Sequence, residues 1–285
     1  IKSVAKGSIA EELEIDPGDK LISIDGNEIK DVLETADYGA TAPVWVRASD
    51  NKIYLLKFRH EQNAEKDISN FNEFLAFMLM RELGLRIYKY NIAFITINES
   101  SLRLFSGKVS AESQLNANGS LGTNIGILKI DGAQKFTFSD ISKMPKSLIK
   151  RIANIDNIMM NSDRTQDNTN ILYDPKTKKY SPIDFGLSLL SHRVYEKIKN
   201  GEQIGEMYMN WTAGDVTKDR YYIFKNQNKL NFNKNYNTII TMIDGILAQC
   251  PSEWEVLQYA DEIKQIIAMR ILTDTFKGAC PCYDF

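Results

Sequence analysis

Cysteine, histidine and long apolar segments are scarce in this 285-residue sequence. It has 3 cysteines and 2 histidines, a formal net charge of only −2, and no apolar run that approaches a membrane-spanning helix, which needs roughly 18 residues. The excess of basic residues typical of a dedicated nucleic-acid binder is also absent. We therefore expect neither membrane insertion nor direct nucleic-acid binding. A content of 43% hydrophobic and 25% charged residues predicts a globular protein.

The cysteines indicate a reducing environment. Cys250, Cys280 and Cys282 are odd in number and lie late in the chain, which argues against a disulfide framework and predicts a cytoplasmic location. Cys280 and Cys282 have the alternative of a metal site, but His60 and His192 are the only histidines and no second ligand pair has suitable spacing. We therefore interpret them as ordinary thiols.

The first 34 residues differ from the rest of the chain. The segment Gly7–Leu13 is followed by the turn dipeptides Pro17-Gly18 and Asp25-Gly26, which flank the short strand pattern Leu21–Ile24. This arrangement resembles the central signature of PDZ-like domains. It is too short to bury a core of its own, so we predict that residues 1–34 form a PDZ-like fragment or extension without the peptide-binding groove.

A hairpin and a helix are predicted in the part of the chain that begins at Thr35. Val44–Val46 and Ile53–Phe58 are apolar segments on either side of the turn residues 49–51, a pattern typical of a hairpin. Farther on, apolar residues recur with the spacing of one helix face, and Gly84 supplies a stop signal. These residues are Phe71, Phe74, Leu75, Met78 and Leu79.

The rest of the pattern predicts an α+β protein whose first half is rich in strands. A further strand is predicted at Ile92–Ile97, and residues 106–124 are rich in Ser, Asn and Gly, which predicts a loop between the two halves. The apolar positions through Ile239–Leu247 and Ile263–Phe276 predict helices in the second half.

Two elements of the second half are expected to present polar residues. The apolar spacing from Leu148 to Met159 predicts a helix that ends just before Asn161. Ile171–Tyr173 and Tyr180–Ile183 form a candidate hairpin, and an antiparallel hairpin brings the residues before and after it to one end.

The residues at these ends have the pattern of a phosphoryl-transfer site. Asp163 and Asn168 have the separation of the catalytic Asp and the metal-binding Asn of protein kinases, and Asp184-Phe185-Gly186 follows as the second metal carboxylate. Two oxygen ligands suit Mg²⁺, which completes its shell with phosphate and water. Alternatively, these residues are ordinary turn and strand-end positions.

Further polar residues border this pattern. Asn170 is a second metal candidate, and for Arg164 and Asp167 both a solvated or structural role and a phosphate-handling role remain open.

Lys57 lies on the same strand face as Ile53 and Leu55, so it needs a partner if buried. Glu73 on the following helix supplies one, which leaves the ammonium group to contact phosphates. The alternative is a surface lysine and an unrelated glutamate.

A short loop before Val44 is the candidate phosphate-covering loop. Backbone N–H groups of Gly39, Ala40, Thr41 and Ala42 are available to a phosphate, whereas Pro43 cannot donate.

Together these residues resemble the HipA-like kinases, whose fold is related to that of protein and phosphoinositide kinases. The resemblance extends from about Gly39 to Phe276. It is carried by Gly39–Pro43, Tyr54–Phe58, Asn72-Glu73 before Leu83-Gly84-Leu85, Asn161–Arg164 with Asn168, Ile183–Gly186 and Pro251–Trp254.

The resemblance implies a two-lobed kinase fold that uses ATP and Mg²⁺. Asp163 would be the base, Asn168 and Asp184 the metal ligands, and Lys57 the ligand of the nucleotide phosphates. The toxin members of the family phosphorylate serine or threonine in proteins and autophosphorylate a serine near the phosphate loop. Here that loop has Thr41 and no serine, so we do not expect autoregulation by that route.

The predicted organisation is therefore an extension at residues 1–34, a strand-rich N-lobe at residues 35–124 and a mainly helical C-lobe at residues 125–285. The predicted function is an ATP- and Mg²⁺-dependent kinase with a protein substrate. Two alternatives remain open: a small-molecule kinase with the same ATP-handling residues, and a nucleotide-binding pseudokinase or scaffold.

Overall fold

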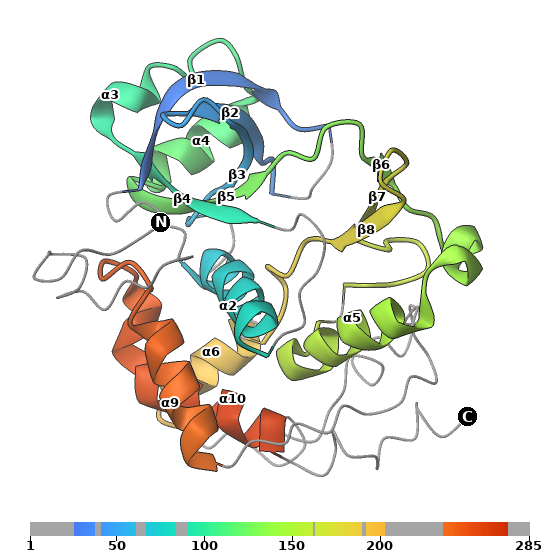
Figure 1. Ribbon diagram of the computed structural model, residues 1–285. Helices are drawn as coiled ribbons and strands as arrows, with labels where there is room; N and C mark the ends of the chain where they lie inside the picture. Colours follow the sequence, from blue (N-terminus) through green and yellow to red (C-terminus); the bar gives the residue numbers. More distant parts are fainter. Residues whose placement is uncertain are drawn as a thin grey trace, which may run out of the picture.

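The structure of the protein is a computed structural model in which residues 26–37, 41–60, 67–83, 91–161, 163–189, 192–202 and 236–272 are described. It contains both strands and helices (Figure 1). The strands are β1 (Asn27–Thr35), β2 (Val44–Ala48), β3 (Ile53–Lys57), β4 (Ile92–Ile97), β5 (Gly122–Leu128), β6 (Gln134–Lys135), β7 (Ile171–Asp174) and β8 (Lys179–Pro182). The helices are α2 (Ile68–Glu82), α3 (Glu99–Leu102), α4 (Ala111–Gly119), α5 (Lys146–Met159), α6 (His192–Lys199), α9 (Tyr236–Leu247) and α10 (Ala260–Leu272), with 3-10 turns η1 (Phe138–Lys143) and η2 (Glu255–Tyr259).

Five strands close into a barrel in the order β1-β2-β3-β5-β4. Neighbouring strands are antiparallel except β1 and β4, which pair in parallel. Alternate side chains of a strand point to one face, and the interior is filled by buried apolar residues such as Val32, Leu56 and Phe105. The barrel, with α3 and α4 against it, forms the upper part of the molecule in Figure 1.

Helix α2 lies between the barrel and the C-terminal helices (Figure 1). Its apolar residues join a core to which α5, α9 and α10 also contribute. The same helix buries three polar residues, Asn70, Asn72 and Glu73, and each of these needs a partner because an unsatisfied buried polar group is costly. No helix of the described residues is both long and apolar enough to cross a membrane.

A second, three-stranded sheet has the order β6-β7-β8. It shares a small core with α5, in which Ile152, Ile171 and Tyr180 are buried. Helix α5 ends at Met159, and the next residue, Met160, has a left-handed backbone with φ of 50°. The chain therefore turns sharply as it leaves the helix toward the candidate catalytic residues.

Most of the predicted elements are confirmed. The hairpins β2–β3 and β7–β8 form, as do strand β4 and helices α2, α5, α9 and α10. The end of the last predicted helix, residues 273–276, and the stop signal Gly84 lie outside the described residues.

Residues 106–124 are not the predicted loop, because they include a helix. Ser110 begins α4 as its N-cap and accepts a hydrogen bond from the Ser113 N–H at 3.1 Å. Ser113 and Asn116 are buried although both are polar. A polar helix of this kind lacks the apolar periodicity by which a helix is recognised.

The boundaries predicted at residues 34 and 124 both fall inside barrel strands. β1 begins at Asn27, and β5 continues to Leu128. In β1 the buried residues Ile29 and Val32 are three positions apart, because the pairing with β2 shifts register beside each of them. Such a bulge breaks the strand period of two, which explains why the sequence pattern did not reveal β1.

Candidate active site

Three charged side chains meet where β3, α2 and the segment after β8 approach one another. Lys57, the last residue of β3, pairs through Nζ with Glu73 of α2 and lies 2.5 Å from Asp184 Oδ1. Glu73 is fully buried, whereas the Asp184 side chain is 37% exposed. The predicted Lys57–Glu73 pair is confirmed, and the alternative of a surface lysine is wrong. The contact between Lys57 and Asp184 is an addition to the prediction.

The charges of this cluster stabilise one another. Burial lowers the pKa of Lys57, but the carboxylates of Asp184 and Glu73 outweigh it, so the pKa lies above its usual value. Burial raises the pKa of Asp184, but the cations of Lys57 and Arg164 outweigh this effect, so the pKa lies below its usual value. Lys57 and Asp184 are therefore both charged around neutral pH.

The Asp184-Phe185-Gly186 segment is attached to α2 by its backbone. The Phe185 N–H donates to Glu73 Oε1 at 2.9 Å, and Asn72 Nδ2 donates to the Gly186 carbonyl at 2.8 Å. Asp184 itself has a left-handed backbone with φ of 64°. The sequence gives Asn72 no role beyond its place in the Asn72-Glu73 motif, although a polar residue among the apolar residues of a predicted helix is a signal for such a role.

The loop after α5 brings Asp163 and Asn168 together. Asn168 Nδ2 donates to Asp163 Oδ2 at 3.0 Å, and Asn170 Nδ2 donates to the same oxygen at 2.9 Å. The Asp163 N–H donates to Asn161 Oδ1 at 3.1 Å. Asn170, the second metal candidate, thus uses its amide nitrogen to fix the carboxylate of Asp163.

Arg164 is buried and not solvated, and its hydrogen bonds support a structural role. Its side chain is fully buried, and Nε donates to Asp156 Oδ2 at 2.8 Å. Nη1 donates to the carbonyls of Thr169 and Asn170 at 3.1 and 2.6 Å. The guanidinium therefore ties both ends of the loop to α5. Asp167 lies in the same loop and is exposed.

The end of α5 is held by a residue that sequence reasoning missed. Arg270 of α10 is buried, its Nε donates to the Ile158 carbonyl at 2.8 Å, and its Nη2 donates to the Asn157 carbonyl. The last carbonyls of a helix have no partner within the helix and favour a cation. Arg270 thus fixes the point at which the loop containing Asp163 begins.

Only half of the predicted phosphate loop falls within the described residues, since residues 39–40 do not. Two side chains of α4 hold the other half. Asn116 Nδ2 donates to the Thr41 carbonyl at 3.1 Å, and Ser113 Oγ donates to the Ala42 carbonyl at 2.9 Å. The loop connects β1 to β2, and Ala42 has a left-handed φ of 48°.

The donor atoms of the predicted metal ligands suit a magnesium ion. Asn168 uses its amide nitrogen on Asp163, which leaves its oxygen available to an ion, and Asp184 Oδ2 accepts no hydrogen bond from a described residue. Hard oxygen atoms in small number are what Mg²⁺ takes from a protein. The described residues contain no group of three or more His, Cys, Asp or Glu side chains arranged around a metal site.

Comparison with known families identifies the chain. The sequence model described as HipA-like kinase matches residues 29–278. The chain belongs to the HipA-like kinase family. It is accordingly a kinase-type phosphotransferase, as the resemblance implied. The matched range begins within β1, in agreement with the place of this strand in the barrel.

Other comparisons extend this result. A PDZ-domain model matches residues 1–45 and so overlaps the kinase match. No curated protein sequence matches the chain. The crystal structure of the Golgi casein kinase with Mn/ADP bound has a TM-score of 0.50 at 10% identity, covering 88% of this chain and 73% of that chain. A second crystal structure of the Golgi casein kinase has a TM-score of 0.48 at 12% identity, covering 98% and 77%. The first likeness shows a protein-kinase-like fold.

Proposed function

We propose that this HipA-like kinase transfers the γ-phosphate of ATP to a serine or threonine hydroxyl of a protein, with Mg²⁺, and that Asp163 is the base. The observation that carries the proposal is the environment of Asp163. Two amide groups, from Asn168 and Asn170, donate to the same carboxylate oxygen at 3.0 and 2.9 Å. The carboxylate is thereby held in one orientation at the end of α5.

The other oxygen of Asp163 is the proposed base. Oδ1 accepts no hydrogen bond from a described residue, so it is available to a hydroxyl group. A general base must lie within hydrogen-bonding distance of the proton that it accepts. In phosphoryl transfer the matching role is to orient the acceptor hydroxyl and to receive its proton as the new bond to phosphorus forms.

The nucleotide would occupy the region between the barrel and the helical part, the N-lobe and C-lobe of a two-lobed kinase. Lys57, already charged and held by Glu73, would contact the phosphates. The backbone N–H groups of residues 39–42 would cover them. Asn168 and Asp184 would hold Mg²⁺, which neutralises charge on the phosphates when bound.

The choice of a protein as the acceptor rests on the likeness to the HipA-like kinases. Among the residues named above, Asp163 alone would contact the acceptor, and the others would handle ATP and the metal. Labelled ATP with the purified chain and a panel of protein and small-molecule acceptors tests this part. Transfer to small molecules alone would make the chain a small-molecule kinase, and Mg-ATP binding without any transfer would make it a nucleotide-binding scaffold.

The role of Asp163 is tested by Asp163→Asn. We expect turnover to fall by about 10²-fold or more, the scale of lost acid–base assistance, with Mg-ATP affinity changed by only a few fold. Asp167→Asn is the matched control, because it makes the same chemical change at an exposed position of the same loop. Wild-type turnover in Asp163→Asn would overturn the assignment.

A further inference from the structure

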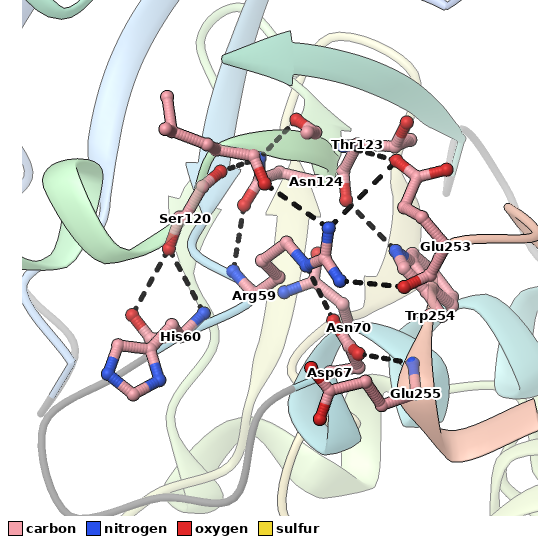
Figure 2. Close-up of polar contacts among 12 residues, drawn as sticks. Arg59, His60, Asp67, Asn70, Ser120, Thr123, Asn124, Glu253, Trp254 and Glu255 are labelled. Atoms are coloured by element: carbon pink, nitrogen blue, oxygen red, sulfur yellow. Dashed lines mark hydrogen bonds and ion pairs between the residues drawn. The ribbon is translucent and has the colours of Figure 1, made fainter. Parts of the chain in front are cut away.

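The segment Pro251–Glu255 attaches the C-terminal helical part to the barrel (Figure 2). Trp254 Nε1 donates to the Thr123 carbonyl at 2.9 Å, and Glu253 Oε1 accepts a hydrogen bond from the Thr123 N–H at 2.8 Å. One residue of β5 therefore uses both of its backbone groups on this segment. From the sequence alone, Pro251–Trp254 is notable only because it resembles a short segment of the HipA-like kinases.

The same segment reaches the start of α2 through a buried ion pair. Arg59 Nε donates to Asp67 Oδ1 at 2.6 Å, and Arg59 Nη2 donates to the Glu253 carbonyl at 3.0 Å. The Glu255 N–H donates to the other Asp67 oxygen at 2.7 Å. Asp67 is the N-cap residue of α2 and is fully buried. Figure 2 shows Arg59, Asp67 and the residues Glu253 and Glu255 of the C-terminal part converging.

Apolar contact completes the attachment. Trp254 is 1% exposed, and its ring meets those of Phe74 and Phe94 edge-on, with centroids 6.2 and 6.0 Å apart. Edge-to-face aromatic pairs add to the stabilisation that burial gives. Phe74 follows Glu73 directly in α2, so the indole packs against the same turn of the helix from which Glu73 reaches Lys57.

Helix α2 is consequently bound at two points to the end of β3 and to the residues that directly follow it. Lys57–Glu73 is one ion pair, and Arg59–Asp67 is the other. Two separated points fix the direction of the helix as well as its distance from the barrel. The segment Pro251–Glu255 contacts both partners of the second pair, Arg59 and Asp67.

We propose that the segment Pro251–Glu255 is a positioning element that holds α2 in the orientation in which Glu73 reaches Lys57. Trp254 and Glu253 are its positioning residues, and they act through Glu73 without touching the substrate. This proposal rests on the proposed function, in which Lys57 contacts the phosphates. It adds that the C-terminal part of the chain determines where Glu73 lies and thereby the position of the Lys57 ammonium group.

A double-mutant cycle on kinase activity tests the proposal. We expect Trp254→Phe, which keeps an aromatic ring but loses the donor, and Glu253→Ala each to lower kcat/KM for Mg-ATP by about tenfold. In the Glu73→Gln background the same changes should have less than about a twofold effect, because the interaction through which they act is already lost. Glu253→Gln keeps the acceptor oxygen and should restore activity. Equal losses in both backgrounds would overturn the proposal.

Amide hydrogen exchange of α2 provides a readout that does not depend on catalysis. We expect Trp254→Phe to raise exchange across Ile68–Glu82, whereas Tyr54→Phe should not. Tyr54→Phe is the matched control, since it also removes one donated hydrogen bond, to Asp50 at 2.8 Å, and keeps a buried ring. A chain that transfers no phosphate to any acceptor, yet shows this exchange difference, would contradict the proposed function and leave the positioning of α2 supported. Unchanged exchange in α2 would overturn the positioning itself.

Discussion

Lys57 Nζ lies 2.5 Å from Asp184 Oδ1 while it also pairs with Glu73, so one ammonium group joins the barrel, α2 and the segment after β8. The raised pKa of Lys57 contributes stability that is complete below its usual value of about 10.4 and is lost as the pH rises through the higher folded value. The lowered pKa of Asp184 contributes stability above about 3.9 that is lost as the pH falls through the lower folded value. We therefore expect any pH dependence of turnover between about 6 and 9 to come from other groups.

The first prediction concerns Asp184→Asn. Asp184 is both a partner of Lys57 and the proposed carboxylate ligand of Mg²⁺, so its loss should weaken Mg²⁺-dependent nucleotide binding itself by about tenfold or more. It should also lower the pKa of Lys57, because the Asp184 charge is the largest of the effects that raise it. Isothermal titration with Mg-ATP measures the affinity, and the pH dependence of amine labelling at Lys57 measures the pKa. Undiminished Mg-ATP affinity would show that Asp184 is not a ligand of the metal.

The second prediction concerns Lys57→Met and Glu73→Gln. Since the two side chains form one buried pair, we expect their effects on turnover to be non-additive, with the double variant resembling the worse single variant. The comparison requires kcat and KM for all four proteins. Losses that multiply fully would mean that the two residues act independently.

The third prediction concerns the N-terminal boundary. Deletion of residues 1–25 should leave ATP affinity within a few fold, because every proposed nucleotide contact lies at or beyond residue 39. Deletion of residues 1–33 removes most of β1, including the buried Ile29 and Val32, and exposes the edges of β2 and β4. We expect this second deletion to lower the melting temperature sharply or to prevent folding. Equal stability of the two truncated chains would show that the barrel does not need β1.

The sequence predicted the parts of the fold in which one physical signal dominates. The apolar face of α2 and the hairpin around residues 175–178 are patterns of regular period, and both formed. β1 and α4 were missed for opposite reasons. β1 has an apolar pattern interrupted by register shifts, and α4 is a helix whose buried face is polar, with Ser113 and Asn116.

The sequence also predicted the candidate site residues themselves better than the residues that hold them in place. Asp163 and Asn168 are close because they lie in one short loop, whereas Lys57 and Glu73 lie on β3 and α2, and the need of a buried lysine for a partner predicted their contact. Arg270 and Asp67 contribute through contacts between distant segments, and no local pattern encodes such a contact.

The fourth prediction concerns the buried pair Arg164–Asp156. Loss of one partner leaves the other charge buried, which typically costs about 3–5 kcal/mol. We therefore expect Arg164→Met to lower the free energy of unfolding by about that amount, measured by urea denaturation. Lys143→Met, which breaks the exposed pair of Lys143 with Asp140, is the control and should have little effect. A loss no larger than that of the control would show that the loop is held by its other hydrogen bonds.

The last prediction concerns the close approach of Gly186 to α2. A Cβ at Gly186 would lie 2.6 Å from Ser69 Oγ and 3.6 Å from Ser69 Cβ, whereas favourable contacts begin near about 3.5 Å. Gly186→Ala must therefore displace either the Ser69 hydroxyl or the segment that contains Asp184. Because small displacements of aligned groups can reduce rates strongly, we expect turnover to fall by about tenfold.

The same geometry predicts a rescue by a second change. Ser69→Ala removes the hydroxyl oxygen and keeps the Cβ, whose distance of 3.6 Å is an ordinary contact. Ser69→Ala alone should have nearly wild-type turnover, and the double variant with Gly186→Ala should recover most of the lost activity. Turnover of the four proteins, with melting temperatures to verify folding, provides the test. If the double variant is as slow as Gly186→Ala alone, the loss comes from the backbone of the Asp184-Phe185-Gly186 segment and not from contact with α2.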